Sequence, residues 1–213
     1  MKIDLSGTTA VITGSTGGIG LAIARGLAGS GASVVVNGRS QVKADAAAEA
    51  IIKAVPGAKA RGVAADVSTA DGIRELVAAY MAHESSLDIL VNNAGAAWGA
   101  AFDEFPESGW DKVVDLNMKT PFFLTQALHG LLTAGARERP AKVINIASID
   151  GQSVNPMETY PYAASKAGLI HLTKRMALRL VSDNIMVSGI APGAFASDMN
   201  RDARDHADAV AER

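Results

Sequence analysis

The chain has 213 residues, of which 48% are hydrophobic and 20% are charged, a composition typical of one compact globular domain with a sizeable core. Its formal net charge is −2, so we expect no nucleic-acid partner and no electrostatic attachment to a membrane surface. The absence of cysteine excludes disulfides, thiolate metal sites and a cysteine nucleophile.

The sequence has no segment that predicts export or membrane insertion. No run of about 18 apolar residues occurs, and residues 1–7 lack the apolar stretch of a signal peptide. We therefore expect a cytoplasmic protein. Because no linker, repeat or change of composition divides the chain, we expect residues 1–213 to form a single domain.

Short apolar runs rich in β-branched residues alternate along the chain with longer alanine-rich stretches of helical spacing. This alternation predicts βαβ units, and hence a doubly wound, Rossmann-type α/β sandwich of three layers with a mostly parallel sheet. The expected strands are residues 9–13, 33–37, 62–65, 89–92, 142–147 and 185–190. The expected helices are residues 18–28, 43–54, 70–82, 109–117, 121–134 and 162–180.

The first predicted strand runs into a glycine-rich sequence, TGSTGGIG, at residues 13–20. Glycines let the backbone turn sharply and approach a pyrophosphate, whose charge can rest at the helix N-terminus. Glycines also mark ordinary strand-to-helix loops, but the strand before, the helix after and a second strand ending at Asn37 favour a dinucleotide site. The candidate cofactor-binding residues of this turn are Gly14, Ser15, Thr16, Gly18, Ile19 and Gly20.

The end of the second predicted strand indicates which dinucleotide binds. An acidic residue here would hydrogen-bond the adenosine ribose and select NAD, but the sequence has Asn37 and Gly38. Arg39 follows, and a guanidinium can pair with a 2′-phosphate in bidentate geometry. The alternative is a solvated surface arginine after a turn. We expect Arg39 to favour NADP over NAD.

Tyr162 and Lys166 lie four residues apart in a predicted helix, and therefore on one face of it. An ammonium group beside a phenol lowers the pKa of the phenol, so Tyr162 could exchange a proton with a carbonyl oxygen near neutral pH. Taken alone, such a pair is also typical of two exposed side chains on a helix surface. Ser148, however, follows the fifth predicted strand, at the sheet edge where parallel sheets carry their active sites. Asn117 and residues 92–95 are predicted at the same rim, which favours a catalytic group.

Together these motifs resemble those of the short-chain dehydrogenase/reductase family, in its branch of about 250 residues. The resemblance extends from Leu5 to about Met199. It implies strand order 3-2-1-4-5-6 and hydride transfer between a nicotinamide and a carbonyl or alcohol. The matching motifs are TGSTGGIG (13–20), Asp66, NNAG (92–95), Asn117, Ser148, YAASK (162–166) and Pro192-Gly193.

The resemblance implies roles for four catalytic residues. Tyr162 would be the acid/base, and Lys166 would lower its pKa while holding the nicotinamide ribose. Ser148 would hydrogen-bond the substrate oxygen, and Asn117 would hold a water beside Lys166 in a proton relay. Tyr160 is a second phenol nearby, but it is six residues from Lys166. We therefore expect it in a loop at the substrate mouth or in packing.

The resemblance also assigns cofactor contacts beyond the glycine-rich turn. Asp66 and Val67 would meet the adenine. The other cofactor residues that it implies are Asn93, Ala94 and Gly95 along the cleft, and Pro192, Gly193 and Ser197 at the nicotinamide end, with Tyr162 and Lys166. The histidines at 83, 129, 171 and 206 show no ligand spacing, so we expect no metal site. Asp103 and Glu104 are expected in a solvated turn.

The substrate is predicted from a finer similarity. Residues 92–110 (NNAGAAWGAAFDEFPESGW) and 139–148 (RPAKVINIAS) resemble 3-oxoacyl-acyl-carrier-protein reductases, which implies reduction of a 3-oxoacyl thioester. Sugar, polyol and steroid dehydrogenases share the same frame and remain alternatives. A non-catalytic nucleotide-binding scaffold is an alternative from another class. The loss of Tyr162, Lys166 or Ser148 would support it, but all three are present.

Members of this family usually continue past the place where the sequence stops, with a substrate-covering helix and a last strand. The resemblance therefore predicts a fold that lacks the family's last strand. Relatives commonly use this part of the chain in tetramer packing, so we expect a homo-oligomer, a tetramer or a dimer, in a full-length form.

Overall fold

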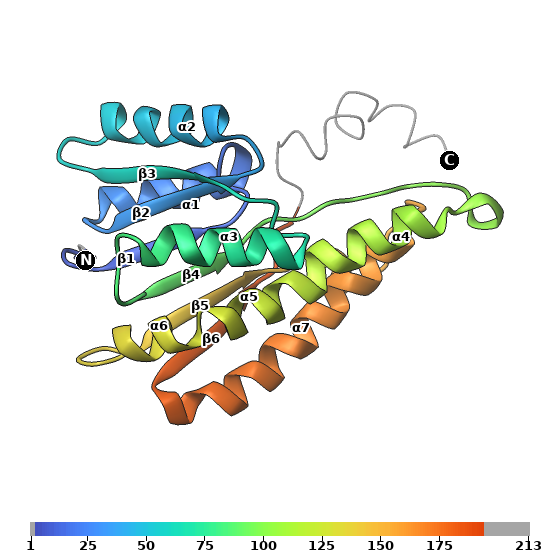
Figure 1. Ribbon diagram of the computed structural model, residues 1–213. Coiled ribbons are helices and arrows are strands. Elements are labelled where there is room, and N and C mark those ends of the chain that lie inside the picture. Colours follow the sequence, from blue (N-terminus) through green and yellow to red (C-terminus); the bar gives the residue numbers. More distant parts are fainter. Residues whose placement is uncertain (1–2, 194–213) are drawn as a thin grey trace.

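The computed structural model describes residues 3–193, which form a parallel sheet covered by helices on two faces (Figure 1). The strands are β1 (Thr9–Ile12), β2 (Ser33–Gly38), β3 (Lys59–Ala64), β4 (Ile89–Asn92), β5 (Ala141–Ile146) and β6 (Ile185–Ile190). Their order is β3-β2-β1-β4-β5-β6, and every neighbouring pair is parallel. The predicted fold class and strand order are confirmed, and the described residues contribute six strands to the sheet.

The helices divide between the two faces of the sheet. They are α1 (Gly18–Gly29), α2 (Gln41–Ala54), α3 (Ala70–Met81), α4 (Glu107–Val114), α5 (Thr120–Ala127), α6 (His129–Gly135) and α7 (Tyr160–Leu180). Successive strand residues point to opposite faces. In β1, Ala10 and Ile12 join a core with α1 and α2, whereas Val11 joins a core with α3, α5 and α7. Two apolar cores therefore share one sheet, which makes three layers.

Several element boundaries differ from those predicted. The stretch predicted as one helix over residues 121–134 is divided at Leu128 into α5 and α6. The helix predicted to end at residue 117 leaves α-helical geometry earlier, because a π-helical turn, Asp115–Lys119, follows α4. Helix α7 begins at Tyr160 rather than Tyr162. Pro161 fits the first helical turn, because an N–H group there would have no acceptor within the helix.

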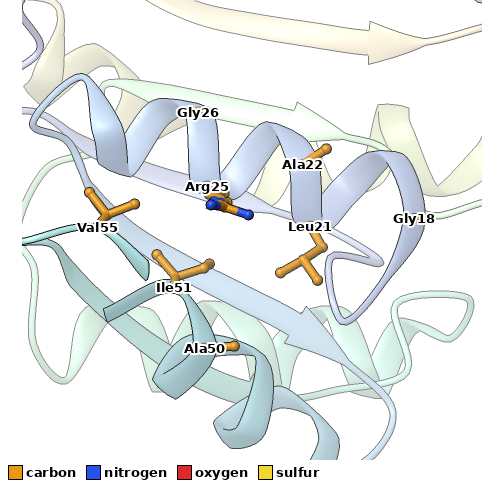
Figure 2. A pocket seen from close by; sticks show the side chains of 8 residues that line it. All are labelled: Gly18, Leu21, Ala22, Arg25, Gly26, Ala50, Ile51 and Val55. Carbon is orange, nitrogen blue, oxygen red and sulfur yellow. The ribbon is translucent and has the colours of Figure 1, made fainter. Parts of the chain in front are cut away.

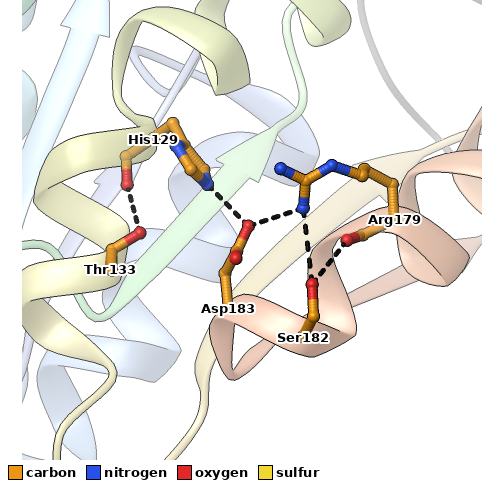
Figure 3. Close-up of polar contacts among 5 residues, drawn as sticks. All are labelled: His129, Thr133, Arg179, Ser182 and Asp183. Atoms are coloured by element: carbon orange, nitrogen blue, oxygen red, sulfur yellow. Dashed lines mark hydrogen bonds and ion pairs between the residues drawn. The ribbon is translucent and has the colours of Figure 1, made fainter.

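A polar cluster joins α6 to the turn that precedes β6 (Figure 3). His129 Nε2 lies 3.0 Å from Asp183 Oδ2, and Arg179 Nη1 donates to the same oxygen at 2.8 Å. These two hydrogen bonds lower the pKa of Asp183. His129 thus links the start of α6 to the turn that follows α7. Within residues 3–193 no three histidine, aspartate or glutamate side chains are grouped as a metal site would require.

A groove of about 580 Å³ separates α1 from α2 on one flank of the molecule (Figure 2). Leu21, Ile51 and Val55 line it, with Arg25 between them, and the small residues Gly26 and Ala50 leave the space open. None of the four predicted catalytic residues lines this groove. Of the helices within residues 3–193, none has the length and hydropathy needed to cross a bilayer.

Candidate active site

The turn between β1 and α1 depends on glycine at three places. Gly14 and Gly18 have φ of 60° and 54°, in the left-handed region that only glycine adopts freely. A Cβ on Gly20 would lie 2.6 Å from the carbonyl oxygen of Gly14, so no side chain fits there. A Cβ on Gly18 would instead meet open space, and Gly17 caps α1 without a side-chain hydrogen bond. The first N–H groups of α1 are thus left accessible to an anion.

The end of β4 holds the glycine-rich turn in place. Asn93 Nδ2 donates to the carbonyl oxygens of Thr13 and Gly14, at 2.9 and 3.0 Å. The backbone N–H groups of Asn93 and Ala94 both donate to Thr13 Oγ1 at 3.0 Å. Thr13 is therefore the buried junction between the turn and β4. The sequence motif begins at Thr13, but its side chain was not singled out from the sequence.

Ser15 and Asn37 connect the turn to β2 from inside the sheet. Ser15 is fully buried, and its hydroxyl donates to the Ile12 carbonyl and accepts from the Asn37 N–H. The Asn37 amide donates to the carbonyls of Val63 and Ala65. Both side chains are occupied by hydrogen bonds of the fold, and the Ser15 backbone N–H also donates, to the Asn37 carbonyl at 2.9 Å.

The end of β2 lies beside the glycine-rich turn. A Cβ on Gly38 would lie 2.5 Å from Thr16 Cγ2, so Thr16 fills the space that a side chain at position 38 would need. Arg39 follows on the surface, and no side chain within residues 3–193 pairs with its guanidinium. Arg39 is thus the cation at this corner that remains available for a ligand phosphate.

Asp66 and Val67 form the turn after β3. Asp66 is exposed, and its Oδ1 accepts hydrogen bonds from the backbone N–H and the hydroxyl of Ser68. Val67 is buried, and its carbonyl accepts a hydrogen bond from Thr120 Oγ1 at 2.8 Å. The turn is therefore attached to the start of α5.

Tyr162, Ser148 and Lys166 come together where β5 ends and α7 begins. Ser148 follows β5, and its hydroxyl shares a hydrogen bond with Tyr162. Lys166 Nζ donates to the Ile146 carbonyl at 2.8 Å and lies 5.6 Å from the centre of the Tyr162 ring. Tyr162 and Lys166, four residues apart on one face of α7, thus lie close to Ser148. The sequence predicted Ser148 at this strand end.

The expected lowering of the Tyr162 pKa is wrong in direction. Burial raises the pKa of Tyr162, the hydrogen bond with Ser148 opposes this, and the charge of Asp150 adds to it. Lys166, whose ammonium lies 5.6 Å from the centre of the Tyr162 ring, is not among the groups that cause this shift. Burial also lowers the pKa of Lys166 from 10.5 to about 8. Near neutral pH, Tyr162 is a protonated phenol beside a partly desolvated ammonium.

Asn117 lies in the π-helical turn, a deviation from α-helix that often marks a functional site. Its Oδ1 accepts from the Ala96 N–H at 2.8 Å, and its Nδ2 donates to the Ala96 carbonyl and to Ser165 Oγ. Gly95 separates Asn117 from Lys166, since a Cβ on Gly95 would lie 3.2 Å from Asn117 Oδ1 and 3.6 Å from Lys166 Nζ. The Asn117 side chain therefore holds the loop after β4 against α7.

The segment after β6 reaches the same rim. Pro192 accepts a hydrogen bond from the Ile149 N–H at 3.0 Å, next to Ser148, and a Cβ on Gly193 would meet open space. The predicted contact Ser197 lies outside the described residues.

Tyr160 was expected in a loop or in packing. It lies in the first turn of α7, not in a loop, and it packs against Phe102 and Phe105. Sequence reasoning also missed Ser165, which lies inside the YAASK motif and bonds Asn117.

The comparison with known proteins agrees with this arrangement. The family model for short chain dehydrogenases matches residues 8–208. The chain belongs to the short-chain dehydrogenase family. The predicted family and the predicted class, an oxidoreductase acting on CH–OH groups, are both confirmed.

Relatives of this short-chain dehydrogenase have different named activities. It is 42% identical to the rhamnolipids biosynthesis 3-oxoacyl-[acyl-carrier-protein] reductase of Pseudomonas aeruginosa, over 93% of this chain and 77% of that enzyme. It is 36% identical to gluconate 5-dehydrogenase of Gluconobacter oxydans, over 92% of this chain and 74% of that enzyme.

Solved structures of relatives share its fold. The Pseudomonas aeruginosa RhlG/NADP active-site complex superposes with a TM-score of 0.92 at 40% identity, covering 98% of this chain and 80% of that one. A gluconate 5-dehydrogenase from Burkholderia cenocepacia, in complex with NADP and tartrate, superposes with a TM-score of 0.88 at 35% identity, covering 97% and 79% of the two chains.

Proposed function

We propose that this dehydrogenase interconverts a carbonyl and a secondary alcohol with NADP(H), and that its substrate is a 3-oxoacyl thioester. The observation that carries the proposal is the meeting of Ser148, Tyr162 and Lys166 where β5 ends. A phenol with a raised pKa is protonated at neutral pH, so it can donate a proton to a carbonyl oxygen. A protonated Tyr162 therefore suits the direction of carbonyl reduction.

The residues around the glycine-rich turn fit a dinucleotide. The turn offers open space at Gly18 and the free N–H groups of α1, both suited to a pyrophosphate. Asn93, Ala94 and Gly95 continue the wall towards Lys166. When bound, NADPH supplies the hydride that reduces the substrate.

Arg39 supports NADP over NAD. It is exposed beside the turn, where an acidic residue would otherwise bind ribose hydroxyls. Its guanidinium suits the 2′-phosphate in bidentate geometry. The NADP named with two solved relatives agrees with this choice.

The catalytic residues have separate tasks in the proposed reaction. Ser148 and Tyr162 donate hydrogen bonds to the substrate oxygen, and Tyr162 gives it a proton as the carbonyl carbon is reduced. Lys166 holds the ribose and supports the negative charge that develops on the Tyr162 oxygen. Asn117 keeps the loop after β4 in position and thereby shapes the wall beside Lys166.

Two further proposals concern the assembly of the chain. Residues 1–213 would form one domain, supported by two cores that share one sheet. Copies would associate into a dimer or tetramer, supported by the exposed rings of Phe122 and Phe123 beside a groove of about 400 Å³ between α5 and α7. Light scattering after gel filtration tests this, and a monomer at micromolar concentration would contradict it.

A substrate panel tests the activity. We expect NADPH absorbance to fall fastest with a 3-oxoacyl thioester, and more slowly or not at all with 5-ketogluconate and a 3-ketosteroid. The specific alternative is gluconate 5-dehydrogenase activity, which one relative's name supports. Faster turnover of the sugar acid than of every thioester would decide for that alternative, and NADPH binding without turnover of any carbonyl compound would favour a non-catalytic scaffold.

A further inference from the structure

Four aromatic side chains form a partly exposed group at one end of the molecule, which we call the aromatic cluster: Phe102, Phe105, Trp110 and Tyr160. The ring of Tyr160 lies 5.7 Å from that of Phe102 and 5.9 Å from that of Phe105, and Trp110 continues the row at 6.4 Å from Phe105. The chain has only five Phe, three Tyr and two Trp, so this is a strong local concentration. Phe102 is 73% exposed. Apolar surface that is left in water in this way often marks a binding site.

The aromatic cluster lies at the start of the helix that carries Tyr162. Tyr160 is the first residue of α7, two residues before Tyr162. The segment that carries Phe102 is attached there, because the Ala100 N–H donates to the Glu158 carbonyl at 3.3 Å. Figure 1 shows α4 and the start of α7 side by side, extending beyond the carboxyl ends of the strands. The cluster is therefore held at the rim that carries Ser148.

Two further exposed apolar side chains lie in the chain between Ser148 and Tyr160. Ile149 follows Ser148 directly, and Met157 precedes Tyr160 by three residues. Both are about half exposed. A ligand whose carbonyl reached Ser148 could thus lie against apolar side chains on its way to Tyr160.

The charges nearest Tyr160 and Phe102 are negative, whereas Lys112 lies near Trp110 at the other end of the cluster. Tyr160 Oη lies 3.4 Å from Glu158 Oε1, and Asp103 and Glu104 are exposed next to Phe102. Desolvation, followed by the charges of Glu158 and Asp103, raises the pKa of Tyr160. A ligand carboxylate would be repelled at this surface, whereas an uncharged hydrocarbon chain would not. This distinguishes an acyl chain from a sugar acid.

We propose that the aromatic cluster binds the apolar acyl chain of the substrate, distal to the reacting carbonyl, and so determines selectivity for chain length; this rests on the proposed 3-oxoacyl thioester reduction. Each methylene that leaves water is stabilised by about 0.8 kcal/mol, or about fourfold in affinity. The ring of Phe102 is the most exposed of the four and provides the outer part of the surface. It therefore contributes to the binding of long acyl chains and not to that of short ones.

The test compares 3-oxoacyl N-acetylcysteamine thioesters of four to twelve carbons with NADPH. For the wild type, kcat/KM is expected to rise with chain length and then level off. Phe102→Ala should lower kcat/KM by about tenfold for the longest chains and by less than about twofold for the shortest. Phe102→Leu keeps apolar surface and should retain most of the selectivity. Leu178→Ala removes an equally exposed apolar side chain far along α7 and should change nothing.

The outcomes separate this inference from the function on which it rests. In one outcome the protein reduces the shortest thioester, while Phe102→Ala leaves kcat/KM unchanged or lowers it equally at every chain length. This result overturns the inference and leaves the proposed function standing. A change of molar mass in Phe102→Ala by light scattering, with equal loss at every length, identifies the cluster as a contact between copies and also overturns it. Failure to reduce thioesters of any length overturns the proposed function itself.

Discussion

Replacement of Lys166 with methionine should make the cofactor-free protein more stable while abolishing its activity. The Lys166 side chain is 4% exposed, and its Nζ donates to the Ile146 carbonyl. No carboxylate within residues 3–193 forms an ion pair with it. Burial lowers its pKa from 10.5 to about 8, which corresponds to about 3 kcal/mol against the charged form.

The sign of the effect depends on pH. Between the folded pKa of about 8 and the unfolded value of 10.5, the unfolded chain binds more protons, so wild-type stability rises with pH through this window. Methionine has no charge to bury but loses the charge-assisted hydrogen bond to Ile146, worth about 2 kcal/mol. Lys166→Met should therefore add about 1 kcal/mol to the free energy of unfolding near pH 6.5. Above pH 10.5 the gain should vanish or reverse.

Urea unfolding of the cofactor-free protein, followed by circular dichroism, measures the free energy of unfolding of the wild type and of the variant at each pH. Lys53→Met, on the exposed side of α2, is the matched control and should change stability by less than about 0.5 kcal/mol. A Lys166→Met variant that is less stable than the wild type near pH 6.5 would show that burial of the ammonium does not destabilise the fold. So would a stability difference that does not change with pH.

Three further substitutions test the site. Tyr162→Phe should leave the melting temperature nearly unchanged and lower turnover by about 10²–10⁴-fold, whereas Tyr160→Phe should retain turnover; similar rates for both variants would move the acid/base role elsewhere. Arg39→Leu should weaken NADP binding by about tenfold or more and hardly change NAD binding, by calorimetric titration of each; equal losses would contradict a 2′-phosphate contact. Gly20→Ala would place a Cβ 2.6 Å from the backbone of the turn and should abolish NADPH binding, while Gly29→Ala, in open space on the same helix, should not; normal binding by Gly20→Ala would show that the turn tolerates a side chain.

The sequence predicted the frame of the molecule because the frame depends on periodicity. Alternating strand and helix patterns indicated six strands of a parallel sheet, and strand ends indicated the rim that holds Ser148 and Asn117. The helix boundaries near Leu128 and Tyr160 were less predictable, since a helical pattern continues across Leu128 and Pro161 is compatible with either a loop or a first helical turn.

The use of individual polar side chains could not be predicted from spacing. The side chains of Ser15 and Asn37 donate hydrogen bonds to backbone carbonyls inside the sheet. These carbonyls come within reach only when the strands are packed together. The pKa of Tyr162 follows its burial rather than the nearness of Lys166, and burial is a property of the whole fold. The side chain of Asn117 is taken up by Ala96 and Ser165 for the same reason.

Isotope transfer from NADPH shows whether the protein reduces a 3-oxoacyl thioester and whether the reaction needs Tyr162. NADPH deuterated at the transferred position of the nicotinamide is incubated with a 3-oxoacyl thioester, and the product is analysed by mass spectrometry. We predict one deuterium on C3 of the 3-hydroxyacyl product with the wild type, and almost none in the same time with Tyr162→Phe. A wild-type protein that binds NADPH yet delivers no deuterium to any 3-oxoacyl thioester would contradict the account.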